Sequence, residues 1–276
     1  MNTHRPDPAQ TRTGSRTATP GRMFIAVTLL VFAASMAATV AGCLSMSAMD
    51  SMPMAGGWSM SMAWMRMPGR SWLETAASFV GMWGVMMIAM MLPSITPMLM
   101  RYRSALDGAG EHRVDLLPAL AAAGYVLVWA MLGAALFVPG AVLATVAMRH
   151  PSLARAMPLA AGIVVALAGA LQLTRWKARR LACCREAVPW ESLLKANAGT
   201  ALRHGVRLGL QCTACCASPT AVLLALGVMD ARAMAGVTAA IALERLTPAG
   251  PRFARVIGGI AIAAGLLLVV RALARD

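Results

Sequence analysis

The sequence predicts an all-α protein, a polytopic bundle of about seven transmembrane helices. Of its 276 residues, 59% are hydrophobic and only 13% are charged, whereas soluble domains carry about a quarter charged residues. The mean hydropathy is +0.66, and apolar runs long enough to cross a bilayer recur along the chain. These properties exclude a soluble globular enzyme and favour a single membrane domain.

The first 22 residues are dominated by Thr, Pro and Arg and contain almost no side chain that could be buried. Such a segment cannot offset the entropy lost on ordering. We therefore expect a disordered cytoplasmic tail over 1–22, followed by a transmembrane helical domain over 23–276.

The first span is expected over 24–44, where a continuous apolar run of 21 residues can cross about 30 Å of hydrocarbon. The run ends in Val40-Ala41-Gly42-Cys43, which resembles a lipoprotein cleavage site. Because the run is longer than a usual signal core and many spans follow it, retention as an anchor is the favoured interpretation. Six further spans are expected, at 78–99, 116–138, 157–173, 208–229, 231–243 and 256–270. The run 231–243 has only 13 residues, so six crossings are the alternative to seven.

The basic residues indicate the orientation. With seven spans, 18 of the 25 Lys and Arg residues fall on the side of the N-terminus, in the tail, in 100–115, in the basic loop 174–207 and between 245 and 255. The positive-inside rule then places the N-terminus in the cytoplasm. The net charge of +14 does not indicate a nucleic-acid partner, because aromatic residues make up only 5% and no nucleic-acid module is visible. The expected partner is the lipid bilayer.

Motifs of common enzymes are absent from the sequence. It contains no GxxxxGK[ST], HExxH or GxSxG motif, and its four His residues are scattered. A hydrolase, kinase or dehydrogenase therefore has no support, and we do not expect an enzyme.

The informative feature is sulfur, with 23 Met and 6 Cys residues. The expected external segment 45–70 holds eight methionines, of which Met49, Met52 and Met54 are our candidate ligands. Thioethers are soft ligands that select Cu(I), and they need no deprotonation outside the cell, where thiols oxidise. The alternative is that these methionines are flexible apolar filler at the membrane surface, with Trp residues as anchors.

A second group of methionines lies in the span 78–99. Helical spacing puts Met87, Met90 and Met91 along one face, with Met82 and Met86 on a neighbouring face. Met98 follows two prolines that interrupt backbone hydrogen bonding, which is tolerated where the helix is buried or lines a site. We expect Met87, Met90, Met91 and Met98 to contact a metal; the alternative is packing or lipid contact.

A cysteine cluster opens the span 208–229. Cys212, Cys215 and Cys216 are three and four residues apart, so all three sulfurs can point toward one side of a helix. In the expected orientation they lie toward the reducing cytoplasm and form a soft-metal site of thiols. Thiol-disulfide exchange is the alternative chemistry.

Three further features belong to the same region. Cys183 and Cys184 lie in the basic loop, where nearby Arg favours thiolate, so they either pass metal to the cluster or are ordinary thiols. Glu244 and Arg245 are expected to form an interfacial ion pair, with a functional carboxylate as the alternative. Gly205-x-x-x-Gly209 predicts close helix packing.

Three strings carry a resemblance to a known family. They are Ala89-Met90-Met91-Leu92-Pro93-Ser94-x-x-Pro97-Met98, Gly199-x-Ala201-Leu202-Arg203-x-Gly205-x-x-x-Gly209-x-x-Cys212-x-x-Cys215-Cys216 and Gly227-Val228-Met229-Asp230. Over 45–270 the chain resembles the bacterial domain of unknown function 2182, whose members are described as predicted metal-binding integral membrane proteins. The family's loop pattern Lys-x-x-Cys-Leu-x-x-Cys-Arg begins here at Lys177, with Arg180 in place of the first cysteine. The resemblance implies a multi-pass protein of the bacterial inner membrane.

Together these features predict a membrane protein that binds or handles a soft metal, Cu(I), through Met and Cys ligands. A periplasmic or cytoplasmic metal carrier is the expected protein partner. The alternatives are a membrane thiol-disulfide component and an assembly partner in which Met and Cys only pack.

Overall fold

The computed structural model describes residues 18–48, 52–66, 69–185 and 197–274. Over these residues the chain forms eight α-helices, one short hairpin and one 3-10 turn. The elements are α1 (Ala18–Ala48), β1 (Met52–Met54), β2 (Trp58–Met60), η2 (Met62–Trp64), α2 (Trp72–Gly108), α3 (Leu116–Arg149), α4 (Pro151–Gln172), α5 (Arg175–Arg185), α6 (Ala198–Leu226), α7 (Ala231–Leu246) and α8 (Gly250–Leu273). The predicted all-α class is confirmed.

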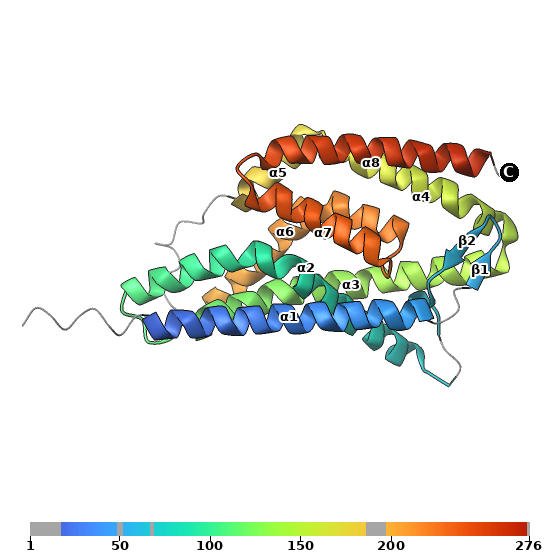
Figure 1. Ribbon diagram of the computed structural model, residues 1–276. Helices are drawn as coiled ribbons and strands as arrows, with labels where there is room; N and C mark the ends of the chain where they lie inside the picture. Colours follow the sequence, from blue (N-terminus) through green and yellow to red (C-terminus); the bar gives the residue numbers. More distant parts are fainter. Residues whose placement is uncertain (1–17, 49–51, 67–68, 186–196, 275–276) are drawn as a thin grey trace, which may run out of the picture.

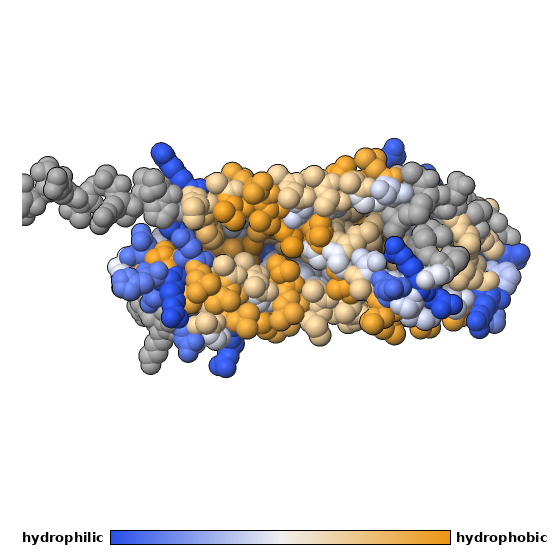
Figure 2. All heavy atoms as spheres, turned by 90° about the horizontal axis from the view of Figure 1, so that it is seen from below, coloured by the Kyte–Doolittle hydropathy of each residue, from blue (hydrophilic) through white to orange (hydrophobic). Residues whose placement is uncertain are grey.

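The helices form an elongated bundle suited to a bilayer. Six of the described helices are long and apolar enough to cross a membrane, namely α1, α2, α3, α4, α6 and α8. Figure 2 shows a broad apolar band between two polar ends on the face in view. Burying such a band in hydrocarbon removes it from water. The chain is therefore a multi-pass membrane protein.

The expected span 231–243 is the helix α7. Its 16 residues are fewer than the roughly 20 that a membrane-crossing helix needs. Even so, α7 runs antiparallel to α6 and returns the chain to the end of the bundle at which α6 begins. Helix α8 then runs in the same direction as α6 (Figure 1). The N-terminal end of α1 and the C-terminal end of α8 consequently lie at opposite ends of the bundle (Figure 1).

The observed helices extend beyond the expected spans. Helix α1 begins at Ala18, so residues 18–22 of the expected tail are helical, while 1–17 lie outside the described residues. The proline in its first turn is tolerated because those N–H groups have no intrahelical partner. The expected basic loop 174–207 contains α5 and the start of α6. Hydropathy does not detect these polar helical ends, although the sequence of α5 has neither Gly nor Pro to stop a helix.

The methionine-rich segment 45–70 is partly folded over its described residues. Strands β1 and β2 pair antiparallel through a turn in which Gly56 and Gly57 have positive φ values of 96° and 71°, a conformation that favours glycine. Trp58 Nε1 donates a hydrogen bond to the carbonyl oxygen of Ala154 at 2.8 Å. The hairpin is therefore fixed against the junction of α3 and α4.

Close packing of α3 on α6 centres on two glycines. A Cβ at Gly205 would overlap the carbonyl oxygen of Ala121, and one at Gly209 would lie 2.8 Å from the Cβ of Val128. The helices approach so closely because neither glycine has a side chain. The predicted role of the Gly205-x-x-x-Gly209 motif is confirmed. The main core lies here, between α2, α3 and α6, with residues of α1 and α7 at its sides.

Candidate metal centre

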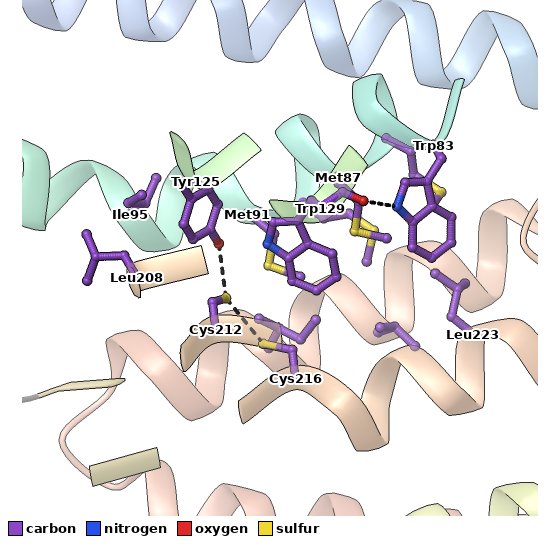
Figure 3. Packing of buried hydrophobic residues seen from close by; sticks show 14 of the residues in the cluster. Trp83, Met87, Met91, Ile95, Tyr125, Trp129, Leu208, Cys212, Cys216 and Leu223 are labelled. Atoms are coloured by element: carbon purple, nitrogen blue, oxygen red, sulfur yellow. Dashed lines mark hydrogen bonds between the residues drawn. The ribbon is translucent and has the colours of Figure 1, made fainter. Parts of the chain in front are cut away.

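Cys212 lies in the middle of α6, and its sulfur has polar partners although the residue is only 1% exposed. Tyr125 Oη of α3 donates a hydrogen bond to Cys212 Sγ at 3.0 Å (Figure 3). Arg245 Nη1 of α7 donates a second one at 2.9 Å. Cys216 Sγ, one helical turn further along, lies 3.8 Å away. Side chains from α3, α6 and α7 thus converge on one buried sulfur atom.

This pair of cysteines has the geometry to share one soft ion. Metal–thiolate bonds are about 2.3 Å long in zinc sites, so two sulfur atoms 3.8 Å apart can contact one ion between them. Two thiolates and one Cu(I) carry a net charge of −1, which is costly to bury unless it is compensated. The guanidinium of Arg245, which contacts Cys212, supplies the opposite charge.

The third cysteine of the cluster points elsewhere. Cys212 and Cys216 belong to the main core, whereas Cys215 packs against Leu181 of α5 and Ala254 of α8. Neighbouring helix residues point about 100° apart. The expectation that the cysteine sulfurs share one side of the helix therefore holds for Cys212 and Cys216 only. Over the described ranges, no group of three or more His, Cys, Asp and Glu side chains is placed to hold a metal. A soft site built here therefore depends on two thiols and on thioethers.

The methionines of α2 lie in the same core as the cysteine pair. Met87, Met90 and Met91 are all buried, at 2%, 4% and 1% exposure, which excludes lipid contact for these three. Met87 and Met91 line a small cavity together with Tyr125, the residue that donates to Cys212. Figure 3 shows Met87, Met91, Tyr125 and the cysteine pair within one buried cluster.

Met98 lies further along α2, beyond the two prolines. It lines a second small cavity with Cys184, Tyr125 and Arg245. This cavity adjoins the cysteine pair, because Tyr125 and Arg245 both donate to Cys212. The structure therefore brings the thioether of Met98 close to the residues that surround the cluster.

The candidate methionines of segment 45–70 differ in their environments. Met52 is exposed, at 39%, while Met54 is half-buried against a cluster of Met60, Ala144 and Ala147. Met49 lies outside the described residues. Part of this segment therefore packs the hairpin onto α3, as the alternative interpretation proposed, and Met52 remains accessible.

The two cysteines of the basic segment lie on helix α5 and differ in environment. Cys183 is exposed, whereas Cys184 is half-buried and its thiol donates to the backbone carbonyl of Gln211 at 3.3 Å. The contact with Cys215, followed by burial, raises the pKa of the Cys184 thiol. Of the two alternatives for Cys184, these contacts favour an ordinary thiol, because its side chain packs against Cys215 and the backbone of α6.

A buried ion pair lies at the same end of the bundle. Lys177 of α5 and Glu244 of α7 are each 1% exposed, and Lys177 Nζ lies 2.7 Å from Glu244 Oε2. Gln172 Nε2 of α4 donates to the other carboxylate oxygen at 2.6 Å. The sequence had suggested that Glu244 pairs with Arg245, and this expectation is wrong. Glu244 pairs with Lys177 instead, because adjacent helix residues point in different directions.

A proline explains why Lys177 reaches into α6. Pro219 has no backbone N–H, so the carbonyl of Cys215, four residues earlier, loses its usual helical partner. Lys177 Nζ donates to this carbonyl oxygen at 2.7 Å. The ammonium group therefore satisfies a freed backbone acceptor and a carboxylate together, beside the cysteine cluster.

Tyr125, Lys177 and Gln172 belong to this site, although the sequence did not predict a role for them there. A signal existed for Tyr125, which is one of only two tyrosines and interrupts an apolar run. Intramembrane polar groups of this kind usually find a partner. Lys177 opens the loop pattern of the resembled family, but the sequence, in which it is surrounded by arginines, did not show that its ammonium group is buried.

Comparison with known proteins identifies the family. Neither the curated proteins nor the solved structures yield a significant match to this chain. A family model described as "PpoB2: Copper chaperone" matches residues 80–268. This region contains the cysteine pair, the buried methionines of α2 and the ion pair, and it covers more than half of the chain. The chain therefore belongs to the PpoB2 copper chaperone family and is a copper-handling membrane protein.

Proposed function

We propose that this protein carries Cu(I) as its cargo at Cys212 and Cys216. The observation that supports this most directly is the buried pair of sulfur atoms 3.8 Å apart, compensated by Arg245. Thiolates are the ligands that Cu(I) prefers. Cys215 and Cys184, which lie beside each other, form the next exchange point toward the end of the bundle that carries α5.

We further propose that methionines deliver the ion to this pair. Met49, Met52 and Met54 collect Cu(I) outside the cell, Met87, Met90 and Met91 relay it, and Met98 lies beside the cysteine pair. The order runs from thioethers, which resist oxidation, to thiolates, which persist in a reducing compartment. A periplasmic or cytoplasmic metal carrier is the proposed partner at either end.

The proposed location is the bacterial inner membrane, with the N-terminus in the cytoplasm. The alternating helix directions (Figure 1) group the start of α1, the turn after α2, helix α5 and the turn after α7 at one end. These segments hold the arginine-rich part of the sequence, which supports a cytoplasmic position. The strings that resemble domain of unknown function 2182 lie inside the region 80–268 matched by the copper chaperone model, so we propose that both describe the same membrane unit.

The test is metal content after anaerobic Cu(I) loading of the full chain in detergent. We expect the Cys212→Ser/Cys215→Ser/Cys216→Ser variant to hold about one Cu(I) per chain fewer than the wild type. The exposed Cys183 provides the matched control, and Cys183→Ser should bind as the wild type does. Equal copper in wild type and triple variant would refute the cysteine site and favour thiol-disulfide exchange or assembly.

The role of Arg245 gives a second prediction. Arg245→Leu removes the charge that compensates a copper dithiolate, so the Cu(I) affinity of the pair should fall about 10- to 100-fold, as for other groups that support metal ligands. Arg232→Leu, at the exposed start of the same helix, is the control. Competition with a Cu(I) chelator measures both affinities, and an unchanged value for Arg245→Leu would contradict the role assigned to the guanidinium.

A further inference from the structure

A cavity lies between α1, α2 and the start of α7, on the side of the core away from Arg245. Its volume is about 190 Å³, and residues 38–43 of α1, 81–86 of α2 and 229–234 contribute to its lining. Five of the lining residues carry sulfur, and they are Cys43, Met82, Met86, Met229 and Met234. A space of this size is well above the ≈ 30 Å³ that a water molecule occupies in the liquid.

We infer that this cavity is a second Cu(I) site, with Cys43, Met86 and Met234 as its principal ligands. Cys43 Sγ donates a hydrogen bond to Met234 Sδ at 3.6 Å, which shows that thiol and thioether face each other. The three residues are 7%, 1% and 7% exposed. Met82 and Met229 are half-buried at the same cavity and complete a set of soft ligands.

Packing alone does not account for this arrangement. Methionine is flexible and usually closes gaps in a core, yet here four methionines border a space that they leave open. The hydroxyl oxygen of Thr39 is buried without a hydrogen-bond partner, and this residue also lines the cavity. A buried polar atom of this kind is uncommon, and a group bound in the cavity is one of the arrangements that would give it a partner.

The charges suit a monovalent soft cation. When a copper–sulfur bond forms at Cys43, the thiol proton leaves to solvent, and one thiolate with one Cu(I) is neutral. No oxidant or reductant is needed for this exchange. A neutral complex suits the apolar surroundings of the cavity, where an uncompensated charge would be costly. Asp230, the exposed N-cap of α7, carries a negative charge that attracts cations toward this side.

The position of the cavity makes it an uptake site. It lies near the C-terminal end of α1 and the first residue of α7, the end of the bundle that also carries the hairpin (Figure 1). Met86 is followed directly by Met87, which lines the next cavity toward Tyr125. This inference rests on the proposed function, since it supplies the first buried station on the path to the cysteine pair.

The experiment separates the two sites in the full-length protein. In the Cys212→Ser/Cys215→Ser/Cys216→Ser background, we expect about one Cu(I) per chain to remain, with only sulfur neighbours in its X-ray absorption spectrum. Adding Cys43→Ser and Met86→Leu should remove this copper. Adding Met131→Leu and Met148→Leu instead, at methionines that are 64% and 40% exposed, should leave it in place.

The outcomes distinguish this inference from the proposed function. If the triple serine variant holds no copper while the wild type does, the cavity is not a site and the cysteine pair stands. If the wild type holds none, both fail. Should the triple serine background not fold, Cys43→Ser/Met86→Leu in the otherwise unchanged chain gives the answer. It should lower the wild-type content by about one Cu(I), and no change would overturn the inference.

Discussion

Replacing Lys177 by methionine is expected to lower the free energy of unfolding by about 3–5 kcal/mol. Lys177 and Glu244 are each 1% exposed, and the ammonium group lies 2.7 Å from the carboxylate. Its removal leaves a buried charge without a counterion, and it also takes the donor from the carbonyl oxygen of Cys215. The loss therefore exceeds that of a surface charge, which is worth about 0–1 kcal/mol.

Denaturation of the purified protein in detergent measures this difference. Arg179→Met, on the exposed side of the same helix, is the matched control and should change stability little. The double variant Lys177→Met/Glu244→Gln should recover part of the loss, because it removes the unpaired charge as well. If Lys177→Met has the same free energy of unfolding as Arg179→Met, the ion pair does not contribute the expected stability.

Gly205→Ala is expected to destabilise the bundle by about 1–3 kcal/mol or more. A Cβ at this position would overlap the carbonyl oxygen of Ala121. Because the obstacle is backbone, no side-chain rotation relieves it, and α6 must move away from α3. The same movement separates Cys212 on α6 from Tyr125 on α3, which are now 3.0 Å apart, so copper affinity should fall together with stability.

Gly236→Ala provides the opposite control. Nothing lies within 4 Å of a Cβ built at this helical glycine, so alanine should stabilise by about 0.4–1 kcal/mol through the unfolded state. Thermal unfolding and Cu(I) competition on both variants check the prediction. If Gly205→Ala and Gly236→Ala shift the midpoint in the same direction, the close contact between α3 and α6 does not control stability.

The sequence alone was sufficient for the membrane class and for the approximate positions of the membrane-crossing helices, but not for their polar ends or for α5. Apolar runs predict membrane-crossing helices directly, because every residue of a span faces lipid or another helix. The strong clusters of Met87 to Met91 and Cys212 to Cys216 were equally visible, since helical spacing fixes which neighbours share a face. The Gly205-x-x-x-Gly209 contact followed from the same local rule.

Only the tertiary structure decided which of these groups meet. Tyr125, Cys212 and Arg245 are far apart in the chain, and their contacts depend on the rotation of three helices about their own axes. Hydropathy does not encode that rotation when a helix is apolar on most sides. For the same reason, the sequence did not predict the pairing of Lys177 with Glu244 or the contact of Cys43 with Met234. Each of these contacts joins helices that are distant in the chain and meet only in the packed bundle.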